Sequence, residues 1–209
     1  MRRILIGLGL AATAAIAIPV IAQNLPTTAP GAKDRSRVTA GTYKTDASHS
    51  LIAWEVTHFG FNPYYGVMTD VTGTLTLDPA NPAAASVNVE IPLAKFTGGN
   101  PALDKHMMSA DFFDVAKFPT ASFQSTKVTL DSDGDEAKIA GNLTIKGISK
   151  PVLLDAELTG AGTNPFNKKE TVGFEAETIV KRSDFGISYG IPMVTDEVKL
   201  KISVAFEKQ

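Results

Sequence analysis

The sequence predicts an all-β protein in which eight antiparallel strands close into a barrel, with one short helix. Eight segments alternate between apolar and polar residues, which is the pattern of a strand with one buried face. Turn-forming residues separate these segments at hairpin spacing, and only residues 100–114 have the pattern of a helix. One helix cannot supply the crossovers of a parallel sheet, and closure removes the exposed edges of antiparallel strands.

The first predicted strand begins at Leu51, and Ile52, Trp54, Val56 and His58 share one of its faces. The apolar residues of the fourth segment change face between Phe123 and Val128, which predicts a β-bulge there. The eight segments, by residue range, are 51–58, 67–77, 87–93, 121–130, 139–145, 152–158, 172–180 and 198–206.

The connections contain the residues that turns require. Turn signals stand at Asp78-Pro79, in the acidic stretch 131–136, at Lys146-Gly147 and at Asn164-Pro165. In the helical segment, Asn100 suits the N-cap position and Pro101 the first helical position. A meander of hairpins with one helix follows.

The N-terminal region predicts export. Residues 1–22 have a positive start, an apolar stretch too short for a membrane span and a small residue, Ala22, before the expected cleavage point. Residues 23–40 are small, polar or Pro/Gly and show no periodicity, which predicts a flexible linker. The folded domain is expected over 41–209. Export without cysteine indicates the bacterial periplasm.

The composition excludes several kinds of site. Of 209 residues, 44% are hydrophobic, 20% are charged and none is cysteine, which excludes disulfide scaffolds, thiolate zinc sites and cysteine nucleophiles. The formal net charge of −2 lacks the basic excess of a nucleic-acid binder. We expect no nucleic-acid partner and no cofactor.

The distribution of aromatic residues indicates a hollow barrel. Strand middles contain mainly Val, Leu, Ile and Ala, whereas most aromatic residues stand near strand ends. Such a barrel leaves an apolar cavity with rings around its opening, although the same rings could close the barrel ends instead. A hollow apolar barrel suits a long apolar chain.

Several motifs resemble the YceI-like family. The resemblance covers about residues 41–207 and rests on Asp46–Ser50, His58, Gly66, Asp104–His106, 109–114, 117–119, 141–147, 150–151, Gly173-Phe174 and 182–186. It implies a lipocalin-like barrel in the periplasm that holds a polyisoprenoid or similar long amphiphile without chemistry of its own. The partner would be a long-chain isoprenoid-type lipid, with transient contact to a membrane surface left open.

One difference from the family pattern concerns the head group. Met107-Met108 stands where the family often has an arginine. If that arginine holds an anionic head group, this chain is expected to prefer a neutral one. The candidate ligand-binding residues are Trp54, His58, Phe59, Tyr64, Tyr65, Val71, His106, Phe112, Phe113, Phe118, Phe123, Leu143, Phe174, Arg182 and Phe185.

Some of these residues have a second interpretation. His58 is as well explained as a core histidine, and His106 as part of a solvated helix face. Arg182, the single arginine of 41–209, is expected in an extended segment where it points the same way as Asp184, either in a structural ion pair or as a phosphate clamp.

Two other functions stay open. Ser188 lies in a Gly-x-Ser-x-Gly sequence, but a nucleophile elbow needs a helix after the serine and a later histidine; Pro192 blocks the helix and all three histidines come earlier. A hydrolase using Ser188 or a histidine metal site is the second interpretation. A ligand-free interaction module of the stress response is the third.

Overall fold

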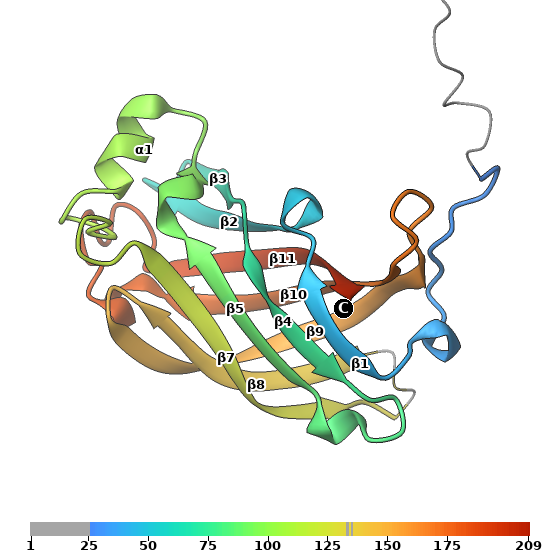
Figure 1. The fold of residues 1–209 in the computed structure, drawn as a ribbon. Coiled ribbons are helices and arrows are strands. Elements are labelled where there is room, and N and C mark those ends of the chain that lie inside the picture. The colour runs from blue at the N-terminus through green and yellow to red at the C-terminus, as the bar shows by residue number, and fades with distance from the viewer. Residues whose placement is uncertain (1–25, 133, 135) are drawn as a thin grey trace, which may run out of the picture.

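One continuous antiparallel sheet dominates the protein (Figure 1). The computed structural model describes residues 26–132, 134 and 136–209. The predicted signal peptide, residues 1–22, and the first part of the predicted linker lie outside these residues. None of the helices within the described part has the length and apolar character needed to cross a membrane.

Eight strands form a closed ring, as the sequence predicts. The ring closes because β1 pairs with two neighbours: Tyr43 lies opposite Leu75 on one side and opposite Lys208 on the other. In order around the ring the strands are β1 (Gly41–Thr45), β4 (Thr72–Leu77), β5 (Ser86–Pro92), β7 (Thr120–Leu130), β8 (Glu136–Ile145), β9 (Ile148–Thr163), β10 (Glu170–Lys181) and β11 (Glu197–Lys208).

Three further strands extend the sheet from β11. β2 (Leu51–His58) pairs with the first half of β11, β3 (Asn62–Met68) pairs with β2, and β6 (Phe96–Thr97) pairs with the end of β3. The edge of β11 is therefore shared between β2 and β1.

The membership of the ring differs from the prediction. The predicted strand 51–58 is β2, which lies outside the ring, and β1 takes a place that the alternation did not reveal. The predicted strand 67–77 is divided between β3 and β4 near Asp70, which has a positive φ of 59°. The predicted β-bulge is confirmed, because the pairing of β7 with β8 shifts register between Ser125 and Lys127.

The helix begins where the sequence predicts and ends earlier. In α1 (Pro101–Met107), the Asn100 side chain accepts hydrogen bonds from the N–H groups of Ala102 and Leu103, at 3.0 and 3.4 Å. After α1 the chain continues in turns, and Asp114 has a positive φ of 51° that an α-helix does not allow. Figure 1 shows α1 and the loops after it at one end of the barrel.

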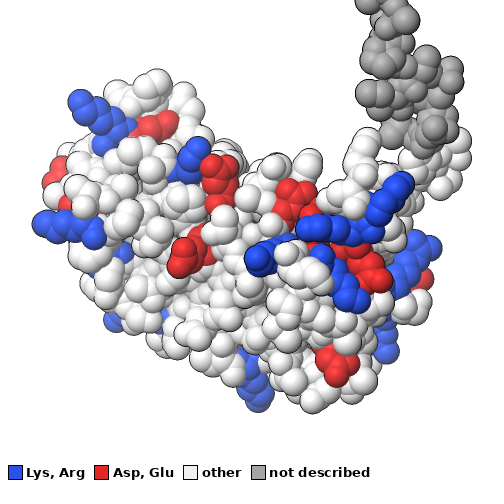
Figure 2. All heavy atoms as spheres, viewed as in Figure 1, with Lys and Arg blue, Asp and Glu red and all other residues white. Residues whose placement is uncertain are grey.

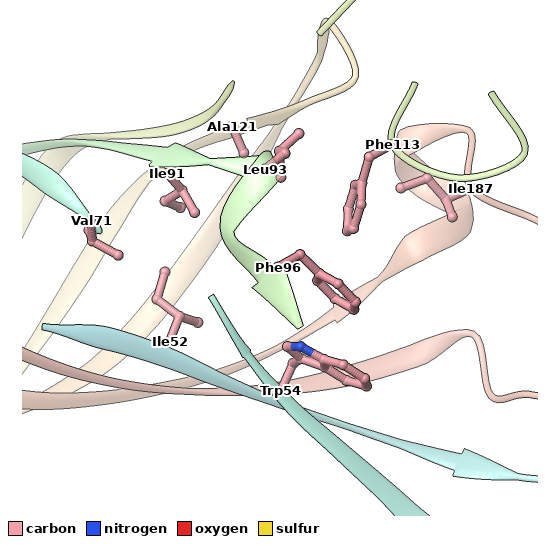
Figure 3. Packing of buried hydrophobic residues seen from close by; sticks show 9 residues of the cluster. All are labelled: Ile52, Trp54, Val71, Ile91, Leu93, Phe96, Phe113, Ala121 and Ile187. Atoms are coloured by element: carbon pink, nitrogen blue, oxygen red, sulfur yellow. The ribbon is translucent and has the colours of Figure 1, made fainter. Parts of the chain in front are cut away.

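That end is closed by packed side chains, and we call it the closed end. Trp54, Leu93, Phe96, Phe113 and Ile187 are all buried there (Figure 3). They come from β2, β6, the short helix η5 (Leu93–Lys95) and two loops, so the extra strands and the loops together cover the ring. Two other clusters, centred on Phe123 and on Tyr43, follow the inner face of the sheet.

The second half of the predicted linker is ordered against the barrel. Ala32 forms a β-bridge with Ala161 of β9, and Lys33 forms an ion pair with Glu157. Residues Arg35–Arg37 form the short helix η2, whose N-cap Asp34 accepts a hydrogen bond from the Ser36 N–H. Composition suggested a flexible segment, but backbone pairing with the end of β9 fixes it, because that strand extends beyond β8.

Candidate ligand-binding site

The barrel encloses an apolar cavity of about 510 Å³. This volume lies in the range of small-molecule sites. Inward-facing residues of seven ring strands and β2 form most of its wall. The aliphatic residues of the wall include Ile52, Val71, Leu75, Val87, Val89, Ile91, Ile139, Leu143, Val152, Leu154, Leu158, Leu200, Ile202 and Val204.

The cavity is closed at one end and open at the other. Ile52, Val71 and Ile91 line it and also belong to the buried cluster of the closed end. At the opposite end its lining includes the exposed residues Pro79 and Leu130, from the turn before β5 and from the end of β7. We call this end, where the turn 78–85, Gly134, Glu136 and η2 lie, the open end.

The cavity is longer than it is wide. On β5 its lining runs from Ser86 at the open end to Ile91 at the closed end. These five residue steps, at about 3.3 Å each, give a length of about 16 Å. A slender chain fits such a space better than a compact ligand does.

Polar groups of the wall are few and partly satisfied. The Ser50 hydroxyl donates to the Asp46 carbonyl at 2.7 Å and accepts from the Ala205 N–H at 3.1 Å. Among the lining residues that the structure describes, the charged ones are Arg35 and Glu136, and both lie at the open end. The arrangement therefore offers an apolar channel with a polar rim.

Four of the predicted site residues line the cavity: Val71, Phe123, Leu143 and Phe174. Trp54, Phe113 and Phe185 are buried in side-chain clusters outside the lining. The remaining aromatic and histidine candidates do not line it either; they are His58, Phe59, Tyr64, Tyr65, His106, Phe112 and Phe118.

Most of these residues lie near the closed end, so the rings do not surround the opening. His58 is exposed at the end of β2, next to the half-exposed Phe59. The Tyr64 hydroxyl donates to the Gly98 carbonyl at 2.7 Å, and Tyr65 on the other face of β3 is 59% exposed.

Contacts within the same region account for the others. His106 lies 3.0 Å from Asp111 through Nε2 and makes edge contacts with Phe112 and Tyr189. Phe118 packs against Gly147 in the turn after β8. These contacts stabilise loops, and the cavity lining consists mainly of aliphatic residues.

Arg182 has a structural environment that differs from both predicted ones. It begins the short helix η6 (Arg182–Phe185), which is not extended, so Arg182 and Asp184 do not share a face. The residue is 8% exposed, and its guanidinium donates to backbone carbonyls of Thr195 at 2.9 Å, Val194 at 2.9 Å, Tyr189 at 2.7 Å and Ile187 at 3.3 Å. The side chain therefore fixes the loop 186–196 at the closed end.

Asp196 supports the same loop. Its carboxylate accepts hydrogen bonds from the Ser183 N–H at 2.8 Å and the Ser183 hydroxyl at 2.7 Å. The hydroxyl bond is the main reason that the pKa of Asp196 lies below its ordinary value, with burial opposing it. Burial lowers the pKa of Arg182, and the negative charge of Asp196 opposes that shift.

The residues that a serine hydrolase or a histidine metal site would need do not lie together. Ser188 is exposed in a loop and is followed by turns, not by a helix. His49 contacts Asp46 at 2.6 Å, while His106 contacts Asp111. Within the described residues no three His, Asp or Glu side chains group closely enough to hold a metal ion.

A family model decides the relationship: the YceI-like domain matches residues 43–206. The chain belongs to the YceI-like family. Protein YceI of Salmonella arizonae is 42% identical over 167 residues, which cover 79% of this chain and 86% of that protein.

Solved structures have the same fold. BcnA of Burkholderia cenocepacia aligns with a TM-score of 0.68 and 25% identity, over 77% of this chain and 98% of BcnA. The YCEI protein of Campylobacter jejuni aligns with a TM-score of 0.62 and 29% identity, over 73% and 90%. A polyisoprenoid binding domain from Saccharophagus degradans shares the fold at 13% identity, with a TM-score of 0.60 over 80% and 98%.

The difference from the YceI-like pattern at Met107-Met108 lies away from the opening. Met107 packs against the cluster of the closed end, and neither methionine lines the cavity. Three further residues, Arg35, Ser36 and Val38, line the cavity from the predicted linker and were not among the predicted site residues. No periodicity marks this segment, and only its cluster of basic residues distinguishes it.

Proposed function

We propose that this YceI-like protein is a non-enzymatic carrier that holds a polyisoprenoid or similar long-chain amphiphile in its barrel. The apolar cavity, closed at one end and open at the other, carries this proposal. An extended hydrocarbon chain gains about 0.8 kcal/mol for each methylene group that it removes from water there. Its polar head would stay at the open end, where the charged lining residues lie.

The relatives support a lipid as the ligand. The Saccharophagus degradans domain, which shares this fold, is described as polyisoprenoid binding. The aliphatic wall of the present cavity suits such a chain, because branched hydrocarbon makes dispersion contacts with Val, Leu and Ile at every depth.

A carrier role explains the site better than hydrolysis does. Ester hydrolysis needs a nucleophile and a base within hydrogen-bond reach of each other, and neither Ser188 nor a histidine lines the cavity. Apart from Arg35 and Glu136 at the open end, the described lining residues offer mainly hydrocarbon and a few hydroxyl groups.

The periplasmic location belongs to the same proposal. It is supported by the positive start, apolar stretch and small-residue end of residues 1–22. A test is fractionation of a Gram-negative host that expresses the full chain. Recovery of the shortened chain in the periplasmic fraction is expected, and a full-length chain retained in the cytoplasm would contradict it.

Transfer to or from a membrane requires that the open end reach its surface. The turn between β9 and β10 extends past Glu136, where β8 begins, and carries Phe166 with 74% exposure, followed by Lys168 and Lys169. An aromatic side chain beside basic residues suits the interface of an anionic membrane. We include a transient contact of this turn with membranes in the proposed function.

The function is tested by identifying what the purified protein carries. Organic extraction of protein from a native host, followed by mass spectrometry, is expected to yield a long-chain lipid in near-equal molar amount. The delipidated protein should then rebind that lipid and no short-chain analogue. Protein that carries no lipid and binds none would contradict the proposal, and ester turnover abolished by Ser188→Ala would support the hydrolase instead.

A further inference from the structure

The segment formed by residues 32–38, which we call the strap, crosses from β9 to the open end. Two backbone hydrogen bonds join Ala32 and Ala161, at 3.1 and 2.8 Å, and Lys33 pairs with Glu157 on the same strand. At its other end, Val38 packs against the buried cluster that contains Tyr43. The strap is therefore held at both ends by the barrel.

The middle of the strap covers part of the opening of the cavity. Arg35, Ser36 and Val38 are among the lining residues, together with Gly134 on the opposite side. The guanidinium of Arg35 lies directly against Gly134, in the turn between β7 and β8. The docked strap thus reaches across the opening, and a slender chain that enters the cavity has to pass it.

The chain directly after the strap is firmly fixed. The Tyr43 hydroxyl donates to the Thr39 carbonyl at 2.7 Å, and Tyr43 itself is fully buried. The Lys208 ammonium donates to the Thr39 hydroxyl at 2.6 Å, and that hydroxyl donates to the Glu170 carboxylate. Thr39 is therefore a fixed point about which the strap can turn while β1 keeps its place in the ring.

The strap itself is docked by few and exposed contacts. None of its residues is buried, and both side chains of the pair between Lys33 and Glu157 are about half exposed. Figure 2 shows charged side chains of both signs at the end where the N-terminal segment joins the barrel, so water reaches this surface. β9, in contrast, is paired with β8 and β10 along most of its length. A segment with little buried apolar surface detaches at a lower free-energy cost than a paired strand does.

The docking depends on one glycine of β9. A Cβ atom at Gly162 would overlap the carbonyl of Pro30, directly before the strap, and this backbone group cannot move alone. A Cβ at the nearby Gly160 would lie 3.7 to 3.9 Å from the backbone of Ala32, an ordinary contact. The two glycines thus form a matched pair, in which only Gly162 is needed for the approach.

We propose that the strap is a gate for the bound lipid. When docked on β9 it narrows the opening and retains the lipid. When it detaches and turns about Thr39, the opening widens and the lipid enters or leaves. This inference rests on the proposed function and adds the step that controls exchange of the ligand. Because opening precedes both loading and release, a change in docking alters the two rates together and changes the Kd little.

A disulfide between the strap and β9 tests the gate. The chain contains no cysteine, so Ala32→Cys combined with Ala161→Cys provides a single pair. These residues face each other in an antiparallel bridge, where Cα atoms lie about 5.5 Å apart, within the reach of a disulfide. Oxidation should slow loading and release by about tenfold or more, because the open form is no longer populated, and reduction should restore both. The matched control joins β8 to β9 through Lys138→Cys with Asp155→Cys, and its oxidation should change neither rate.

The probe for both rates is trans-parinaric acid, a straight-chain polyene acid that fluoresces in apolar surroundings. Mixing it with the delipidated protein gives the loading rate. Transfer from the loaded protein to an excess of phosphatidylcholine vesicles gives the release rate.

The glycine pair tests the gate in the opposite direction. Gly162→Ala should raise the rates of loading and release about tenfold, because the two backbone hydrogen bonds of the strap are weakened. Gly160→Ala should leave both rates unchanged. Far-UV circular dichroism and the denaturation midpoint check that the variants fold, and the disulfide decides alone if Gly162→Ala does not fold.

The outcomes separate the two proposals. If the wild type takes up neither parinaric acid nor any other long-chain lipid, the proposed function fails. If it takes up lipid but the disulfide between the strap and β9 changes neither rate, the gate is overturned while the carrier function stands. The same holds if Gly162→Ala speeds release without speeding loading, because the strap would then be a ligand contact and not a gate.

Discussion

Trp54 of β2 stacks on Phe96 of β6, with ring centroids 4.8 Å apart and planes inclined by 12°. Both side chains lie outside the closed ring of strands, yet both are buried, so the pair covers one end of the ring (Figure 3). Gly66 of β3 permits this, because a Cβ there would overlap the indole ring. The extra strands thus convert an open tube into a cavity with a closed end.

Phe96→Ala tests the contribution of this pair to stability. Truncation removes the stacked ring and leaves a cavity beside Trp54 and Phe113, so the free energy of unfolding should fall by about 3 to 5 kcal/mol. Urea denaturation measures the loss. Phe61→Ala is the control, because that ring is 87% exposed and its removal should change stability by no more than about 0.5 kcal/mol. Equal losses in the two variants would mean that the stacked pair does not stabilise the fold.

Arg182→Met tests whether the buried guanidinium fixes the loop 186–196. Removal of the donors leaves four backbone carbonyls without their partner, and the free energy of unfolding should fall by about 3 kcal/mol. Lys181→Met, at an exposed neighbouring position, is the control and should have little effect. Lipid affinity should remain in any Arg182 variant that stays folded. Loss of binding at unchanged stability would indicate a ligand contact instead.

The depressed pKa of Asp196 predicts how stability depends on pH. Because the pKa is lower in the folded protein than the ordinary value of 3.8, the ionised carboxylate stabilises the fold above that value. This contribution is lost as the pH falls through the folded pKa. The difference in unfolding free energy between the wild type and Asp196→Asn should therefore be constant above about pH 5 and shrink below it.

Ser183→Ala isolates the cause of that shift. Without the hydroxyl, the pKa of Asp196 measured by NMR titration should rise toward its ordinary value. A difference between wild type and Asp196→Asn that stays constant down to pH 2 would contradict the role assigned to the carboxylate.

Alternation in the sequence was sufficient to predict the barrel, because most inward residues of β5 and β7–β11 are apolar and recur at every second position. It missed β1, since Tyr43 is the single large apolar residue of that strand. It also missed β6, which has two residues. A strand defined by its partners and not by its own pattern cannot be recognised from local sequence.

The ends of the cavity could not be assigned from the sequence. Aromatic residues near strand ends could either surround the opening of the cavity or close the end of the barrel. The residue that decides between these arrangements, Phe96, lies in a short strand after a helical turn. The polar rim was missed for a related reason. Arg35 lies in a segment without periodicity, and only its pairing with β9, more than a hundred residues away, places it at the opening.

Leu143→Trp tests whether the cavity is the lipid site. Leu143 faces the cavity from β8, and a larger ring there should block it, so that uptake of a long-chain lipid is lost. Asn142→Trp is the control, because the adjacent side chain is exposed on the outer face of the same strand and its replacement should not affect uptake. Fluorescence of a bound polyene lipid measures both. Unchanged uptake in folded Leu143→Trp would place the ligand elsewhere.

The dependence of affinity on chain length tests the closed end directly. While the chain is shorter than the cavity, each added methylene group leaves water for an aliphatic wall, which should strengthen binding about fourfold. Once the chain reaches Ile52 and Ile91, further carbons project from the opening and affinity should become constant. Phe96→Ala enlarges the space at that end, so the same series measured on this variant, if folded, should reach its plateau at a longer chain. An identical plateau in both proteins would show that the Trp54–Phe96 pair does not limit the length of the bound chain.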